Sequence, residues 1–155
     1  MEHYRVYMSD NVVELKSPPN LIMRPCDLQK LLLDGKTKKP KKKVNWTSTA
    51  NQSQTIKPNK TRNVGIVCSP LSNVFAVDID KCDADWITEE FGGLDKLFEL
   101  CDGTPIQKTP NGFHILFLHN AGMKQIQNKK MGLDTRGGST NGYVVMAGST
   151  VNGKK

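Results

Sequence analysis

The chain is organised around one segment, Val74-Phe75-Ala76-Val77-Asp78-Ile79-Asp80. Its run of apolar and β-branched residues predicts a β-strand, in which alternate side chains point to the same side. Asp78 and Asp80 then share one face, about 7 Å apart along the strand. The opposite face is wholly apolar and is expected to pack in a core (Phe75, Val77 and Ile79).

Two carboxylates on one strand end are unfavourable for stability, because each raises the pKa of the other. A divalent cation resolves this conflict, since Mg²⁺, Mn²⁺ and Ca²⁺ take hard oxygen ligands. Asp-x-Asp also occurs as a solvated strand end or as part of a turn. The pair alone leaves both interpretations open.

Length and composition favour a single intracellular domain. The chain has 155 residues, of which 37% are hydrophobic, and this length is sufficient to bury a core. No apolar run approaches the roughly 18 residues of a membrane-spanning helix, and the first residues have no secretory signal pattern. We therefore expect one domain over residues 1–155, inside a cell, neither secreted nor bound to a membrane.

The positive charge of the chain is local. The net charge is +7, and the segment from Lys36 to Lys43 contains six lysines and no acid. Such a patch favours binding of a polyanion, because neutralised phosphates release their counterions. A solvated loop or a localisation signal gives the same pattern.

The four cysteines, at positions 26, 68, 82 and 101, have no Cys-x-x-Cys spacing. Free, partly buried thiols are therefore predicted. A structural zinc site is the less favoured alternative.

The rest of the pattern predicts a mixture of strands and helices. We expect strands near 4–8, 64–68, 105–108, 113–118 and 143–147, a helix over 26–33, a polar loop or weak helix over 47–62, and a helical segment over 83–100 that Gly92-Gly93 splits. The strand at 64–68 is expected to form an antiparallel hairpin with 74–80. Trp46, after the lysines, is interpreted as a core anchor rather than a stacking platform for a base.

Two further groups of polar residues stand out. His114 lies in a strand whose opposite face is aromatic and apolar, and a single histidine there also fits a purely structural role. Asp134 and Arg136 share a face if their segment is a strand, and a surface ion pair is the simpler explanation. The Gly137-Gly138 pair that follows would allow the backbone to approach a ligand closely.

In this order, these segments resemble the primase-polymerase (prim-pol) domains of the archaeo-eukaryotic primase superfamily, which occur in viral, phage and plasmid replication proteins. The resemblance runs from about Lys36 to Ser149. It is carried by the basic Lys-x-Pro element that ends in Trp46, by residues 63–66, 77–80, 109–114 and 132–138, and by Gly142-Tyr143-Val144-Val145. One departure is Asn111-Gly112-Phe113, where the family often has Gly-Gly.

The resemblance implies an α+β fold, in which a mainly antiparallel, RNA-recognition-like sheet with helices on one face packs on a small N-terminal α/β unit. It implies a catalytic metal site made by Asp78, Asp80 and Asp134 that holds Mg²⁺ or Mn²⁺, with two ions expected. Nucleotide joining is an in-line displacement at phosphorus, which two ions held by shared carboxylates stabilise.

The remaining site residues are expected to contact nucleotides and nucleic acid. His114 matches the family histidine at the incoming nucleotide's phosphates, and Arg136 and Lys39 are expected to bind the nucleotide with it. The other lysines are expected to hold the nucleic-acid backbone without reading sequence (Lys38, Lys41, Lys42 and Lys43).

The expected activity is template-directed DNA primase or polymerase activity in DNA replication, using nucleoside triphosphates with a single-stranded DNA template and primer. By family analogy, the chain is the N-terminal part of a longer primase-helicase type protein, with a fused or associated helicase, in the host-cell cytoplasm or a viral replication site. The alternatives are a degenerate module that binds single-stranded nucleic acid without turnover, a metal-dependent nuclease, and a sugar-nucleotide transferase, which would not explain the lysines.

Overall fold

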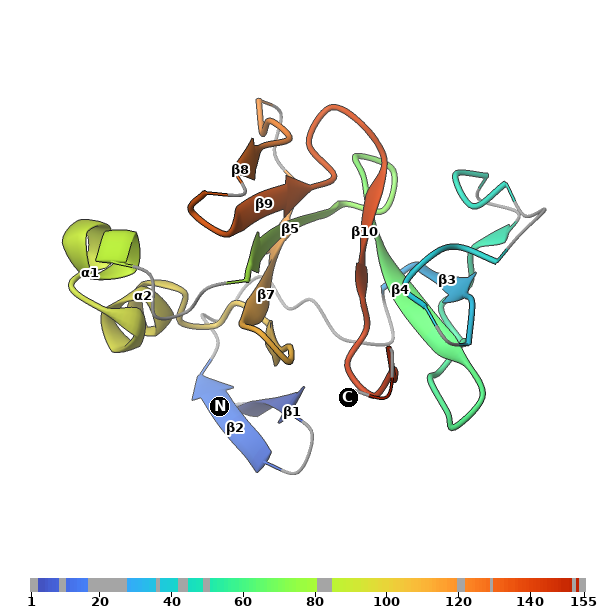
Figure 1. The fold of residues 1–155 in the computed structure, drawn as a ribbon, viewed down its shortest axis with the longest axis horizontal. Helices are drawn as coiled ribbons and strands as arrows, with labels where there is room; N and C mark the ends of the chain where they lie inside the picture. The colour runs from blue at the N-terminus through green and yellow to red at the C-terminus, as the bar shows by residue number, and fades with distance from the viewer. Residues whose placement is uncertain are drawn as a thin grey trace.

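The computed structural model describes residues 3–8, 11–16, 28–35, 37–41, 45–48, 51–80, 85–119, 122–128, 130–151 and 153. Its elements, in chain order, are β1 (His3–Met8), β2 (Asn11–Lys16), β3 (Lys30–Leu33), β4 (Asn63–Cys68), β5 (Val74–Ile79), α1 (Asp85–Phe91), α2 (Leu94–Leu100), β6 (Ile106–Lys108), β7 (Phe113–Leu118), β8 (Gln127–Asn128), β9 (Leu133–Arg136) and β10 (Gly142–Val145) (Figure 1). The predicted site residues Lys42 and Lys43 lie outside the described residues, as do Cys26 and Cys82.

The main sheet has five antiparallel strands in the order β6-β7-β5-β9-β8, with β5 at its centre. Figure 1 shows α1 and α2 beside one face of this sheet. The buried cluster between them joins apolar residues of the strands to the helices (Ile79, Ile106, Phe113 and Ile115 with Ile87 and Leu97), and Val77, Trp86 and Phe98 pack against it. The predicted apolar face of β5 is thereby confirmed.

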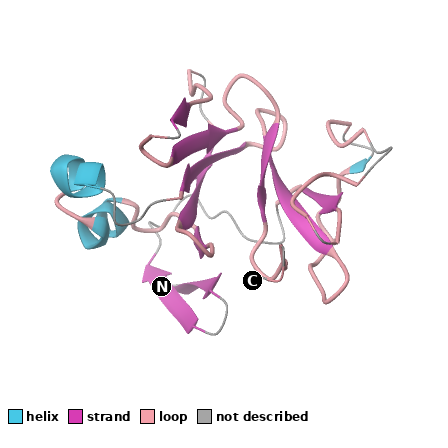
Figure 2. Cartoon of the chain, viewed as in Figure 1, coloured by secondary structure: helices cyan, strands magenta, loops and turns pink. Residues whose placement is uncertain are grey.

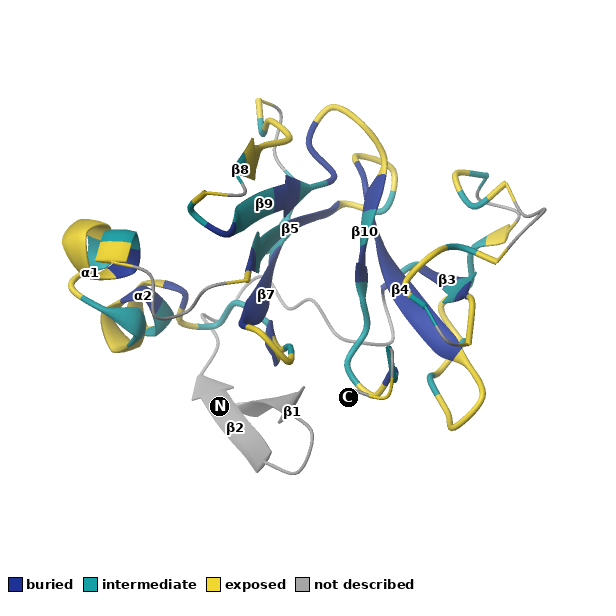
Figure 3. Cartoon of the chain, viewed as in Figure 1, coloured by how far each residue is buried: buried dark blue, intermediate teal, exposed yellow. Residues whose placement is uncertain are grey.

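A second sheet, of three antiparallel strands in the order β10-β4-β3, packs on the other face of the main sheet. Buried residues of both sheets form one cluster between the two layers (Leu28, Ile66, Cys68 and Val144 with Val74, Ala76 and Leu116). Figure 2 shows that α1 and α2 lie on the far side of the main sheet from this layer, and Figure 3 shows the buried strands of both sheets facing each other. The molecule is therefore an α+β protein, as the sequence predicted.

The sheet of β3, β4 and β10 lies where the small N-terminal unit was expected. Its described part contains strands and turns, and it takes β10 from the C-terminal end of the chain. β1 and β2 form an antiparallel pair of their own, which agrees with the strand predicted near residues 4–8. No helix among the described residues is long and apolar enough to cross a membrane.

The helix predicted over residues 26–33 is wrong for its described part, because Lys30–Leu33 forms β3. Leucine favours helix in isolation, but this preference is weak and tertiary contacts override it. Pairing with β4 satisfies the backbone. Leu31 and Leu33 then lie on one face with Val67, where Trp46 and Tyr143 pack against them.

The predicted hairpin between residues 64–68 and 74–80 is also wrong. β4 pairs with β3 and β10, whereas β5 pairs with β7 and β9, so both edges of each strand are already occupied. A single isolated bridge, Ser69 to Val74, joins the two segments. The turn between them carries the chain from one sheet to the other, with Asn73 in the left-handed region at φ 55°.

Other predictions are confirmed. The helical segment divides at Gly92 and Gly93, which have φ values of 77° and 113°. Trp46 packs edge-on against Tyr143 with ring centroids 5.1 Å apart, which is the anchor role. Residues 51–62 contain no helix or strand element, in agreement with the polar loop. Cys68 and Cys101 are free and buried.

Candidate active site

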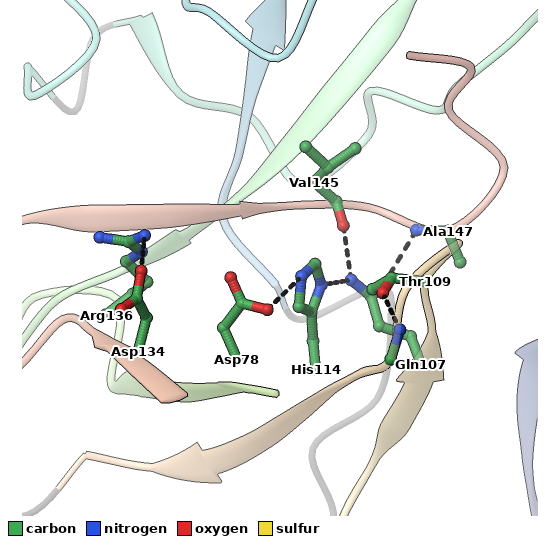
Figure 4. Close-up of polar contacts among 9 residues, drawn as sticks. Asp78, Gln107, Thr109, His114, Asp134, Arg136, Val145 and Ala147 are labelled. Carbon is green, nitrogen blue, oxygen red and sulfur yellow. Dashed lines mark hydrogen bonds and ion pairs between the residues drawn. The ribbon is translucent and has the colours of Figure 1, made fainter. Parts of the chain in front are cut away.

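The site is built around Asp78, on the face of β5 that looks toward the three-stranded sheet. In the antiparallel register, Asp78 is paired with His114 on β7 and with Asp134 on β9. Residues paired across an antiparallel sheet have their side chains on the same face as close neighbours. Figure 4 shows Asp78 between His114 on one side and Asp134 on the other. Residues distant in sequence therefore form one polar row across three strands.

This row begins where the core between the sheets ends. The preceding pair on the same face, Ala76 and Leu116, belongs to the buried cluster between the two layers. The next pair is Asp78 and His114, whose side chains are 15% and 9% exposed. The site thus places charged groups at the margin of an apolar core, where electrostatic interactions are stronger than in water.

Asp78 has an unsatisfied oxygen. Its Oδ1 atom is buried and has no hydrogen-bond partner among the described residues, and His114 Nε2 lies 3.4 Å from it. A buried carboxylate oxygen without a partner is costly, because it has lost its hydration. The environment fits a divalent cation, which would supply the missing partner to a hard oxygen ligand.

Asp134 is held by an ion pair. Arg136 donates from Nη2 to Asp134 Oδ2 at 2.8 Å, and the two side chains are 24% and 22% exposed. Arg136 pairs in register with Ala76, so it lies next to the core between the sheets. This pair is partly buried and adjoins the polar row, unlike a surface ion pair in open solvent.

Asp80 follows the end of β5 and lies exposed at the margin of the site. Its backbone N–H donates to the carbonyl of Gly132 at 2.8 Å. Partial desolvation raises the pKa of the Asp80 carboxyl, and repulsion from Asp78 raises it further, while Lys38 and His114 oppose the shift. Asp134 adds to the repulsion. The charges of Asp78 and Asp134 therefore both act on Asp80, so the three predicted acids share one electrostatic environment.

The three acids do not yet form a ligand set. Among the residues that the structure describes, no three His, Cys, Asp or Glu side chains are already close enough to hold one ion. The reason is visible in the contacts, since Asp78 faces His114 and Asp134 is turned to Arg136.

The described lysines of the basic segment differ in their relation to the site. Lys38 acts on Asp80, and its carbonyl accepts a hydrogen bond of 3.0 Å from the Tyr143 hydroxyl. The basic segment is also held against β3, because the backbone N–H of Lys41 donates a hydrogen bond of 3.2 Å to the backbone carbonyl of Leu32. Lys39 and Lys41 have exposed side chains. Lys39 remains the predicted nucleotide ligand, and Lys38 is the lysine whose charge opposes the rise in the pKa of the Asp80 carboxyl.

Glycines pack the loops of the site closely. A Cβ atom on Gly112 would lie 1.7 Å from the carbonyl oxygen of Ile79, so the turn before β7 rests directly on the end of β5. The Gly137-Gly138 pair also serves packing: Cβ atoms there would lie 2.6 Å from Cys68 and 2.7 Å from the backbone of Gln125. The approach of this pair to a ligand remains a prediction.

Sequence reasoning missed Gln107. This buried residue on β6 bonds to His114 and to the backbone of the segment 145–147 (Figure 4). A glutamine in a short strand has no local feature that marks such a role. Its partners in β10 and beyond lie 38 and 40 positions away in sequence.

A comparison with protein families identifies the family of the chain. The chain matches the family model described as bifunctional DNA primase/polymerase, N-terminal, over residues 16–155. No curated protein and no solved structure gave a significant match. The family match spans the five-stranded sheet and all the predicted site residues. We conclude that the chain belongs to the family of N-terminal domains of bifunctional DNA primase/polymerases.

Proposed function

We propose that this domain transfers nucleotides in a metal-dependent reaction, as a template-directed DNA primase or polymerase in the replication of a virus, phage or plasmid. The observation that carries this proposal is the polar row on the main sheet, where Asp78 lies between His114 and Asp134 and has an unsatisfied buried oxygen. The family match supports the same reaction class.

Asp78, Asp80 and Asp134 would hold Mg²⁺ or Mn²⁺, and two ions are proposed. Bound ions would stabilise the attacking and leaving oxygens of an in-line displacement at phosphorus. Asp78 and Asp134 occupy paired positions on neighbouring strands. Rotation of their side chains, without movement of the sheet, would bring the carboxylates together.

His114 and Arg136 would then exchange partners. Both now face carboxylates, at 3.4 Å and 2.8 Å. When Asp78 and Asp134 turn to ligate cations, the Nε2 of His114 and the guanidinium of Arg136 become donors for the triphosphate of an incoming nucleotide. The same two side chains would thus contact the acids before binding and the phosphates after it.

The basic segment would extend this site toward nucleic acid. Lys38 and Lys39 lie in the segment that Tyr143 and β3 hold, and we assign them to the nucleotide and the adjacent backbone. The following lysines would contact template and primer phosphates without reading sequence. From the family we also propose a fused or associated helicase as a partner, and a location inside the host cell.

One observation favours a second candidate function. Since no three ligands converge among the described residues, a degenerate site that binds single-stranded nucleic acid without turnover is the competing hypothesis. That module would bind in a salt-sensitive manner. Its binding would survive loss of all three acids, and it would need no divalent ion.

The experiment that separates these functions measures incorporation of labelled nucleotides on a single-stranded template with Mn²⁺. We expect synthesis by the wild type and none by Asp78→Asn, which removes the charge and keeps the shape. Glu89→Gln is the matched control, because Glu89 is an exposed acid on α1. Equal synthesis by Asp78→Asn and the wild type would reject the proposed reaction, and template binding without synthesis by either would support the degenerate module.

A further inference from the structure

Gln107 connects the two sheets at the position of His114. Its side chain is almost fully buried, with 7% of the residue exposed. The Oε1 atom accepts a hydrogen bond of 3.0 Å from the backbone N–H of Ala147, and Nε2 contacts both the carbonyl of Val145 and Nδ1 of His114. Figure 4 shows these three bonds converging on the one amide group.

The backbone partners fix the orientation of this amide. The Ala147 N–H can only donate, so its partner must be the amide oxygen. The Val145 carbonyl can only accept, so its partner must be the amide nitrogen. The assignment of oxygen and nitrogen in Gln107 therefore follows from two main-chain groups and does not depend on the histidine.

This orientation determines the tautomer of His114. The second hydrogen of the Gln107 amide nitrogen points to Nδ1 of His114, which must then be the unprotonated acceptor. A neutral ring consequently carries its hydrogen on Nε2. Nε2 is the atom that faces Asp78 Oδ1 at 3.4 Å.

Gln107 also supplies hydrogen-bond partners to backbone groups at the edge of β10. β10 is an edge strand of its sheet. The Val145 carbonyl and the Ala147 N–H lie two residues apart, the spacing at which a neighbouring antiparallel strand would pair. The Gln107 amide satisfies both groups from β6, and so joins the main sheet to β10 beside the histidine.

We propose that Gln107 is a positioning residue, which holds His114 as the Nε2–H tautomer and directs that hydrogen toward the phosphates of the incoming nucleotide. This inference rests on the proposed function for its use, but the tautomer itself can be measured without any turnover. Neighbours that orient a functional histidine affect activity by about 10- to 100-fold when they are lost.

The test is a long-range proton–nitrogen NMR correlation spectrum of the histidine rings, recorded at about pH 8, where free imidazole is neutral. We expect His114 to show a hydrogen on Nε2 and none on Nδ1. Gln107→Leu, similar in size but without donor or acceptor, should give a mixture of tautomers. Gln107→Glu, whose carboxylate can only accept, should place a hydrogen on Nδ1.

His119 is the internal control, because its Nε2 lies 3.0 Å from the Gly138 carbonyl and involves no contact with Gln107. Its signals should be unchanged in both variants, which also shows that the variants are folded. A hydrogen on Nδ1 of His114 in the wild type, or the same tautomer in all three proteins, would overturn the inference.

A second measurement separates this inference from the proposed function. If the wild type synthesises nucleic acid, Gln107→Leu should lower kcat/KM for the nucleotide by about 10- to 100-fold. Unchanged kcat/KM together with a changed tautomer would refute the positioning role alone. Absence of synthesis by the wild type would refute the proposed function, while the tautomer result still decides whether Gln107 controls His114.

Discussion

Asp78 on β5 and Asp134 on β9 are direct partners in the antiparallel register, although 56 positions separate them in sequence. Each faces a nitrogen donor from the same side of the sheet, the imidazole of His114 for Asp78 and the guanidinium of Arg136 for Asp134. Arg136 thus neutralises Asp134, while the imidazole of His114 lies beside Asp78. Because His114 and Arg136 are also the proposed phosphate donors, the arrangement is suited to exchange their contacts with the acids for metal ions and a nucleotide.

The ion pair of Asp134 is expected to matter far more for activity than for stability. Asp134→Asn should lower nucleotide incorporation by about 100-fold or more, since it removes a metal ligand at the reacting phosphate. Its free energy of unfolding should fall by about 1 kcal/mol, because the pair is partly exposed. Incorporation assays and urea unfolding measure the two effects. A large loss of stability with full activity would contradict the assignment.

Asp80 is expected to destabilise the metal-free protein. Desolvation and Asp78 raise the pKa of its carboxyl. When folding raises the pKa of a carboxyl, the free energy of unfolding of the protein decreases as pH rises through that pKa, because the unfolded chain releases the proton more readily. Asp80→Asn removes this pH-dependent loss of stability, so the Tm of the metal-free variant at neutral pH should exceed that of the wild type by up to about 2 °C.

Two controls accompany this measurement. The difference between Asp80→Asn and the wild type should vanish below the ordinary carboxyl pKa of 3.8, where both side chains are neutral. Added Mn²⁺ should raise Tm of the wild type and leave the variant almost unchanged, since a ligand stabilises only a state that binds it. A lower Tm for the variant at neutral pH would show that Asp80 is not under repulsion.

Gly112 is expected to tolerate no side chain. A Cβ atom there would meet the Ile79 carbonyl at 1.7 Å and the Cα of Asp80 at 3.3 Å, so Gly112→Ala must displace the chain that carries Asp80. Stability should fall by about 1 to 3 kcal/mol, and nucleotide incorporation should fall with it.

Gly122→Ala is the comparison for this prediction. Gly122 has φ +95°, and nothing lies within 4 Å of its Cβ position. The substitution introduces backbone strain of about 1 to 2 kcal/mol without a clash. Incorporation by the folded Gly122→Ala protein should match the wild type, and an equal loss of activity in both variants would show that the packing of Gly112 on β5 is not specific to the site.

Tyr143 is expected to position the basic segment. Tyr143→Phe removes only the hydroxyl that donates to the Lys38 carbonyl at 3.0 Å, while the ring remains against Trp46. Stability should fall by about 1 kcal/mol. KM for the nucleotide should rise with little change in kcat, because Lys38 is less well placed. A change in kcat alone would argue against this role.

The sequence was sufficient where local pattern and tertiary packing agree. In β5, alternation separates the apolar face, with Val77 and Ile79, from the face that carries Asp78, and the apolar face packs in a core as predicted. The helix division at Gly92 and Gly93 was also predictable, since glycine alone adopts those φ values readily.

The rest depended on partners that are remote in sequence. Lys30–Leu33 is a strand because β4 lies beside it, and the spacing of the leucines does not indicate that pairing. β4 and β5 separate because other strands occupy their edges. Gln107 acts through main-chain groups of Val145 and Ala147, which side-chain patterns do not reveal.

Calorimetric titration with Mn²⁺ in the presence of a non-hydrolysable nucleoside triphosphate measures whether Asp78, Asp80 and Asp134 together bind catalytic cations. Parallel titration of the nucleotide analogue alone corrects for ions that bind it in solution. We predict two ions for each wild-type chain, and loss of this binding in Asp78→Asn with Glu89→Gln unaffected. Binding of Mn²⁺ that is equal in the wild type and Asp78→Asn, or absent from both, would contradict the account.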